Sequence, residues 1–135
     1  MEYGSANTAP ENYEKRFFSR PVLCYAEEMN NVQNYKILFQ DICWEHPLKG
    51  ARFKAYEQDG KTIRLVEFTQ ELIEPDWCRK GHIGYVLSGR LENNFDGEII
   101  AFQEGDGIFI PSGEDHKHMA TVSSGTVQLI LFEEI

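Results

Sequence analysis

Short turns punctuate the second half of this chain at nearly regular intervals, and this feature limits the fold more than any other. Each turn carries a glycine, usually after Ser, Asp or Glu, and the runs between turns are short and rich in apolar residues. Glycine adopts the positive φ of tight turns at no steric cost, so each site marks a reversal of the chain. The turns are Ser88-Gly89, Asp96-Gly97, Glu104-Gly105, Ser112-Gly113 and Ser123-Ser124-Gly125. This rhythm is typical of an antiparallel β-barrel or jelly roll.

Alternation of apolar and polar residues upstream of these turns predicts a β-hairpin. Residues 51–57 and 61–69 both alternate, and Asp59-Gly60 lies between them. Further strands are expected over residues 83–87, 90–95, 98–102, 107–110, 116–121 and 126–132. The one weak helix candidate, residues 26–33, is short and has no clear apolar stripe. The sequence therefore predicts an all-β fold.

The length of the chain fits one small domain. A chain of 135 residues forms a single core that buries about two thirds of its unfolded surface. The first residues are polar, as in an arm that lies outside a core. We expect residues 1–35 to be an N-terminal arm and lead-in segment and residues 36–135 to form the β-barrel domain.

Charge and cysteine usage restrict the partners and the compartment. The formal net charge is −9, and Lys and Arg form no dense cluster, which disfavours binding to nucleic acid or an anionic membrane. No apolar run approaches the ~20 residues of a membrane helix, and residues 1–10 lack the pattern of a signal peptide. Cys24, Cys43 and Cys78 are an odd number at scattered spacing, which favours reduced thiols. We therefore expect a cytoplasmic protein.

One motif places a histidine directly after a stretch of constrained backbone. Gly105 is followed after five residues by Pro111, then by Gly113 and His116. The glycines permit a tight turn, residues 108–110 form a short apolar strand, and Pro111 with Gly113 bends the chain before the next strand. This arrangement makes His116 the first candidate for chemistry.

The spacing of Gly105, Pro111, Gly113 and His116 resembles the second motif of the cupin family. Cupins usually carry Asn four positions after the histidine, where this chain has Ala120. The first cupin motif ends in a glycine, and Tyr85-Val86-Leu87-Ser88-Gly89 is similar to that ending. The resemblance implies a double-stranded β-helix, which is a jelly-roll barrel with ligands on its inner face, and a homodimer.

The same resemblance implies a set of metal ligands. A typical first motif supplies two histidines and a glutamate ahead of its glycine. With Gly89 as the anchor, these positions fall on Asp76, Cys78 and His82, and the second motif adds His116. Carboxylate, thiolate and imidazole all bind zinc or iron. The resemblance therefore implies a modified site for a divalent transition metal, with zinc or iron favoured by the thiolate.

Strand geometry is compatible with this ligand set, although simpler interpretations exist for each residue. Asp76, Cys78 and His82 share parity and point to one face of an extended segment, unless the chain bends at Lys80-Gly81. Cys78 is alternatively a small core residue, and Asp76 a turn-former whose carboxylate accepts backbone N–H groups. His118 shares parity with His116 and is a candidate catalytic acid, base or supporting residue. His46, before Pro47, is expected in a loop.

The leading functional prediction is a metal-binding cupin that acts on or binds a small molecule inside the barrel. It would be an oxygenase-like or isomerase-like enzyme in which His118 moves protons. The alternative is a non-catalytic module that senses a ligand or holds a structural metal. A metal-free barrel that uses His116 or His82 as a general base is a third interpretation. Fold and motif together do not select among these functions.

Overall fold

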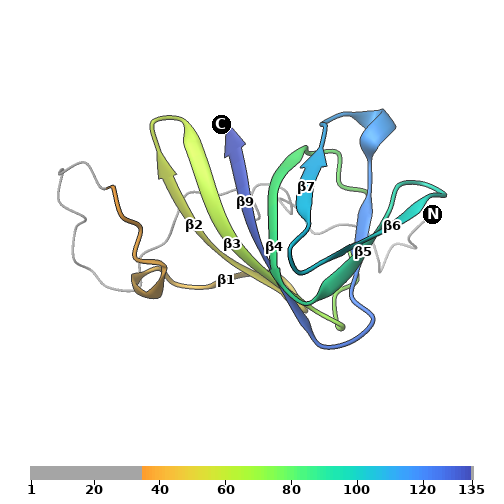
Figure 1. Ribbon diagram of the computed structural model, residues 1–135, viewed down its shortest axis with the longest axis horizontal. Helices are drawn as coiled ribbons and strands as arrows, with labels where there is room; N and C mark the ends of the chain where they lie inside the picture. The colour runs from red at the N-terminus through yellow and green to blue at the C-terminus, as the bar shows by residue number, and fades with distance from the viewer. Residues whose placement is uncertain (1–34, 135) are drawn as a thin grey trace.

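A computed structural model describes residues 35–134, which form nine strands and two short 3-10 turns (Figure 1). The strands are β1 (Glu45–Leu48), β2 (Ala51–Gln58), β3 (Lys61–Thr69), β4 (His82–Ser88), β5 (Arg90–Asn94), β6 (Ile99–Gln103), β7 (Gly107–Ile110), β8 (Met119–Thr121) and β9 (Thr126–Glu134); the turns are η2 (Phe39–Asp41) and η3 (Glu114–His116). The helix expected over residues 26–33 and nearly all of the expected arm lie outside the described residues. Within residues 35–134, no helix has the length and apolar character needed to cross a membrane.

The strands form two antiparallel sheets. One sheet has six strands in the order β1-β2-β3-β9-β4-β7, and the other has three in the order β6-β5-β8. In Figure 1, β5 and β6 lie to the right of the larger sheet. All seven pairings between the described strands are antiparallel, as the turn spacing predicts. The mostly β, antiparallel character expected from the sequence is confirmed.

The core draws on both sheets. Its members alternate with exposed or half-buried residues along each strand, as in β3, where every second side chain from Thr62 to Phe68 is buried. Fully buried side chains from the larger sheet include those of Phe53, Val66 and Val86, and Leu91 contributes from the smaller sheet. This burial supplies the main stabilising free energy, at about 1.5–3 kcal/mol for each large apolar side chain.

The predicted hairpin is confirmed with its turn. β2 and β3 pair from Ala51↔Phe68 to Gln58↔Lys61, so that Asp59 and Gly60 form the two-residue connection. Both residues have positive φ, of 52° and 73°. An Asp-Gly pair with two positive φ angles matches the right-handed twist of the flanking strands, which is why this dipeptide signals a hairpin.

Two expected elements differ in the structure. His46 and Pro47 lie in β1, at the edge of the larger sheet, and not in a loop. An edge strand tolerates proline because one side of the strand needs no N–H donors. The strand expected from residue 116 begins only at Met119, because the preceding residues form η3, where the His116 N–H donates to the Gly113 carbonyl at 3.1 Å.

The expectation of three reduced cysteines is wrong for Cys43, which is disulfide-bonded. Cys78 takes no part in a disulfide. Sequence spacing does not report the spatial distance between sulfur atoms, and a disulfide depends on that distance. Cys24 lies outside the described residues. Cys78 is therefore the cysteine available for chemistry in the described part of the chain.

Candidate metal centre

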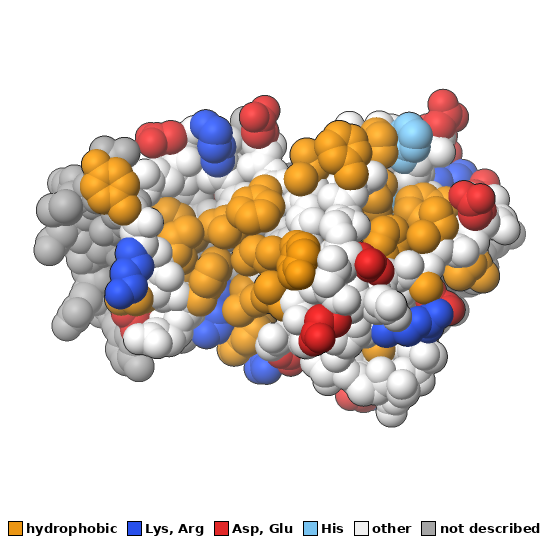
Figure 2. Space-filling model, viewed as in Figure 1, with side chains coloured by type: hydrophobic (Ala, Val, Ile, Leu, Met, Phe, Trp, Pro, Cys, Tyr) orange, Lys and Arg blue, Asp and Glu red, His pale blue; other side chains and the backbone are white. Residues whose placement is uncertain are grey.

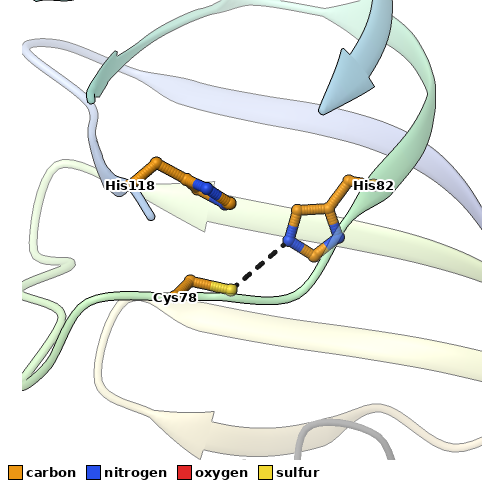
Figure 3. Close-up of side chains that lie close together, drawn as sticks. All are labelled: Cys78, His82 and His118. Atoms are coloured by element: carbon orange, nitrogen blue, oxygen red, sulfur yellow. Dashed lines mark hydrogen bonds between the residues drawn. The ribbon is translucent and has the colours of Figure 1, made fainter. Parts of the chain in front are cut away.

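Three side chains from two separate parts of the sequence gather on the core side of the larger sheet. Cys78, His82 and His118 each offer a ligand atom, and these atoms all lie within 4.8 Å of one another. Figure 3 shows the two imidazole rings and the thiol directed toward a common point. His82 is the first residue of β4, whereas Cys78 and His118 lie in the segments before β4 and β8.

A short backbone pairing brings Cys78 and His118 together. The Cys78 N–H donates to the His118 carbonyl at 2.8 Å, and the His118 N–H donates to the Cys78 carbonyl at 2.9 Å. Two residues that exchange both bonds in an antiparallel pair have their side chains on the same face. The pairing therefore places the thiol and one imidazole side by side.

A glycine lets the chain pass from Cys78 into β4. A Cβ atom on Gly81 would lie 2.8 Å from both the Ile110 carbonyl oxygen and the Ser112 nitrogen. Backbone atoms cannot move aside easily, so any larger residue would displace the segment that joins Cys78 to His82. Cys78 and His82 thus converge across Lys80-Gly81, the point where the sequence allows a bend that would break strict alternation.

An oxygen atom lies beside Nδ1 of each imidazole ring. His118 Nδ1 lies 2.9 Å from the His116 carbonyl oxygen, which only accepts, so Nδ1 carries the hydrogen and Nε2 keeps a lone pair. His82 Nδ1 lies 3.4 Å from Glu133 Oε1, and its Nε2 lies 3.5 Å from Cys78 Sγ. The 3.4 Å contact is longer than a good hydrogen bond, but its carboxylate favours the same tautomer. Proteins commonly hold metal-binding histidines in this way.

Burial keeps His118 in the form that binds metals. The residue is only 3% exposed. Desolvation lowers the pKa of His118, its bond to the His116 carbonyl opposes that effect, and the neighbouring His82 adds to the lowering. The rings of His82 and His118 meet edge to face at a centroid distance of 5.2 Å, and Phe95 packs against His118. A neutral imidazole in an apolar setting is a competent nitrogen ligand.

A buried ion pair between Arg64 and Glu133 lies beside His82. Arg64 is 2% exposed, and its guanidinium donates a short hydrogen bond to Glu133, whose other oxygen faces His82. Desolvation lowers the pKa of Arg64, while attraction to Glu133, Glu45 and Cys78 raises it. The motifs in the sequence did not predict a role for Glu133. The available signal was its parity with Leu129 and Leu131, which marks a charged residue at a core-facing position of β9.

The structure brings together only part of the ligand set that the resemblance implied. Cys78 and His82 converge, and the third member is His118, which the sequence predicts as a candidate catalytic acid, base or supporting residue. His116 is exposed in η3, and its carbonyl, not its ring, contacts His118. Asp76 is also exposed, and its carboxylate accepts the Trp77 N–H at 2.7 Å, which matches the turn-forming alternative. The structure thus places Asp76 and His116 outside the cluster.

A cavity lies beside the cluster. Its volume is about 1030 Å³, and its walls include His82, Arg64 and Glu133. Tyr56, Lys61 and other residues of β2, β3, β7 and β9 complete the walls. Of the three clustered residues, His82 is the one that lines this cavity. A volume of this size is sufficient for a small molecule.

The donor set fits a transition metal. One thiolate and two imidazoles resemble the three-ligand sets of catalytic zinc sites, which keep one position open. Magnesium and calcium prefer oxygen ligands, so sulfur and nitrogen donors select against them. The residues present are therefore suited to zinc or ferrous iron.

Comparisons with known proteins agree with the fold. A family model described as a cupin domain matches residues 74–133, a stretch that contains all three clustered residues and Glu133. Among solved structures, the chain is similar to a cupin-2 domain containing protein from Shewanella frigidimarina, with 20% identity over 62% of this chain and 79% of that chain and a TM-score of 0.51. KdgF from a Halomonas species is similar with 19% identity over 70% and 89% of the two chains and a TM-score of 0.60.

A third similar structure is a putative ethanolamine utilization protein Q from Salmonella typhimurium, with 14% identity over 85% of this chain and 95% of that chain and a TM-score of 0.58. At these identities the likeness concerns the fold alone. A comparison with curated proteins finds no match. The family match and these neighbours lead to one conclusion: residues 74–133 match a cupin domain, and the fold of the chain is similar to that of cupin-domain proteins.

Proposed function

We propose that the protein binds a divalent transition metal through Cys78, His82 and His118, within a jelly-roll barrel formed by the two sheets. The observation that carries the proposal is the convergence of three ligand atoms within 4.8 Å. The orientation of the rings supports it, since each Nδ1 faces an oxygen and leaves Nε2 for a metal. Residues that gathered only to fill a core would not need this arrangement.

Each of these residues would have its own role at such a site. Cys78 as thiolate supplies negative charge, and His82 and His118 supply neutral nitrogen donors. When bound, a zinc or ferrous ion supplies Lewis acidity at its open position. The cavity beside His82 would hold the small molecule on which the protein acts, with Tyr56 and Lys61 among its walls.

A non-catalytic role is the second candidate, and the burial of the cluster favours it. His118 is 3% exposed, and the cavity meets the cluster only at His82. A metal shielded from solvent in this way would stabilise the fold, or it would respond to a bound ligand without catalysing a reaction of that ligand. The coordination number separates the two candidates, because a site closed by four protein ligands has no vacancy for a substrate.

Metal content and the spectrum of a cobalt-substituted form test the proposal. We expect stoichiometric metal in the purified protein, and a sulfur-to-metal charge-transfer band after cobalt substitution that disappears in Cys78→Ser. His82→Ala and His118→Ala should lose most of the metal. Asp76→Asn and His116→Ala are matched controls that should retain it, because their side chains lie outside the cluster. A wild type that takes up no metal, or equal metal in all variants, would contradict the proposal.

A further inference from the structure

The segment that carries Cys78 to the cluster has no helix or strand of its own. Residues 70–81, which we call the connecting segment, join β3 to β4, and their ladder contact is the isolated pairing of Cys78 with His118. A single isolated pair is a weak anchor, because no neighbouring pair supports it. The position of the Cys78 thiol therefore depends on the other contacts that hold the connecting segment.

A buried carboxylate fastens the connecting segment to β8. Glu74 is 9% exposed, and its Oε1 accepts the N–H of Ala120 at 2.8 Å. Ala120 is 5% exposed and lies two residues after His118. The same short stretch of chain thus carries one of the proposed metal ligands and the N–H group that Glu74 binds.

The register of the Cys78–His118 pairing explains why a side chain is needed at this point. The two residues exchange both N–H···O bonds, so the next such pair in a continued antiparallel ladder would join Asp76 to Ala120. Asp76 is instead exposed, and its carboxylate accepts the backbone N–H of the following residue at 2.7 Å. The Glu74 carboxylate therefore accepts the hydrogen bond that the Asp76 carbonyl would receive in a ladder.

An ion pair near the other end of the connecting segment is exposed. Arg79 Nε lies 2.5 Å from Glu114 Oε2, and the two side chains are 43% and 62% exposed. Figure 2 shows acidic and basic side chains on the surface at the upper right, where η3 lies in Figure 1. Water and salt screen an exposed pair of this kind, so it contributes little. Loss of the Glu74 acceptor is more costly, because the Ala120 N–H would stay buried without its hydrogen bond.

We propose that Glu74 is a positioning residue of the metal centre. Its carboxylate holds the connecting segment against β8 and thereby keeps the Cys78 thiol beside the His118 imidazole. Glu74 is not one of the three clustered residues, so it acts through the backbone and not as a ligand. Its effect on metal binding rests on the proposed function, whereas its effect on the Cys78–His118 pairing does not.

Two substitutions at Glu74 test the role of its acceptor oxygen. Glu74→Gln keeps an oxygen that can accept the Ala120 N–H, whereas Glu74→Leu has no acceptor. In competition with a chelator, cobalt affinity should be close to the wild-type value in Glu74→Gln and about 10–100-fold weaker in Glu74→Leu. The sulfur-to-cobalt charge-transfer band should keep its wavelength in Glu74→Gln and shift in Glu74→Leu. Wild-type affinity in Glu74→Leu, or a Glu74→Gln variant that is equally weak, would overturn the proposal.

Two control variants show whether the effect is specific to Glu74. Glu114→Gln removes the charge from the exposed pair with Arg79 and should bind cobalt nearly as tightly as the wild type. Val127→Ala removes volume at a fully buried position near the start of β9, so it should lower stability without changing the cobalt affinity of the folded protein. If Val127→Ala loses as much affinity as Glu74→Leu, a general loosening of the core explains the loss, and the proposal is overturned.

Hydrogen exchange of the chelator-treated protein tests the fastening in the absence of metal. The amides of Cys78 and His118 both donate within their pairing. In Glu74→Leu they should exchange at least about tenfold faster than in the wild type and in Glu74→Gln. Amides of β3, which lies between β2 and β9, should keep their rates. Unchanged rates at Cys78 and His118 would overturn the proposal. Faster exchange in a protein that takes up no metal would support the role of Glu74 in the pairing and contradict the proposed function.

Discussion

At the residue scale, the chemistry of the site depends on the residues that contact the two imidazole rings. Glu133 lies beside His82, and it is in turn held by the buried Arg64. The His116 carbonyl likewise lies beside Nδ1 of His118. A cysteine and two histidines alone would leave each ring free to present either nitrogen. An oxygen atom beside each Nδ1 favours Nε2 as the nitrogen that is offered to a metal.

Replacing Glu133 with Gln should weaken metal binding by about 10–100-fold, as is typical when the carboxylate behind a metal-binding histidine is lost. The variant also leaves Arg64 without its carboxylate, so unfolding should be easier by roughly 3–5 kcal/mol. Competition with a chelator measures the affinity, at a temperature where the variant is folded. Glu134→Gln, an exposed neighbour on β9, is the control and should change neither quantity. Unchanged affinity in Glu133→Gln would exclude a positioning role for Glu133.

The buried His118 predicts how the stability of the metal-free protein depends on pH. Its pKa is lower in the folded state than the ordinary value of 6.5, chiefly because of desolvation. The unfolded chain therefore binds more protons, and the free energy of unfolding rises with pH in this range. The contribution of His118 to the free energy of unfolding should be fully present above the pKa that His118 has in the unfolded chain. It should be lost as the pH falls from that value toward the lower pKa of the folded state.

Urea unfolding of the chelator-treated protein at several pH values measures this dependence. His118→Gln should flatten the change in unfolding free energy between neutral and mildly acidic pH. His116→Gln is the control, because the His116 ring is exposed, and it should leave the slope unchanged. If both variants keep the wild-type slope, His118 is not the group that titrates.

At the element scale, the connection into β4 controls the site. Gly81→Ala would place a Cβ 2.8 Å from backbone atoms of Ile110 and Ser112, so the segment must shift. We expect a loss of roughly 1–3 kcal/mol in the free energy of unfolding, together with weaker metal binding as Cys78 and His82 move apart. Gly107→Ala is the control, since its Cβ would meet only the Gly84 oxygen, at 4.0 Å. Equal stability of the two variants in urea would refute this account.

At the scale of the whole molecule, a bound metal would tie together segments that precede different strands. Cys78 and His82 flank the entry to β4, and His118 precedes β8 of the smaller sheet. Such a link should raise stability by mass action, by ~4 kcal/mol when free metal exceeds its dissociation constant about 1,000-fold. A chelator should therefore lower the Tm of the wild type and have little effect on Cys78→Ser. An equal fall in both proteins would mean that the thiol does not hold the metal.

Local patterns in the sequence predicted the elements of this protein well. Asp59-Gly60 located the hairpin, and glycines such as Gly89 and Gly105 located later turns, because positive φ and strand alternation depend on neighbouring residues alone. β7 was predicted with the bounds that it has in the structure. Cys78 and His82 were chosen from their spacing to Gly89, and the structure places them together. Their role as ligands stays a prediction.

The contacts between distant segments were decided by the tertiary structure. Whether His116 or His118 joins the cluster depends on η3, which turns the chain before the Cys78–His118 pairing forms. The approach of Arg64 to Glu133 and the disulfide at Cys43 likewise depend on how separate strands and segments meet. By itself the sequence determined the strands, the turns and the types of side chain available, because these follow from local backbone preferences. Only the folded chain decided which of those side chains share one site, since the packing of two sheets sets the distances between them.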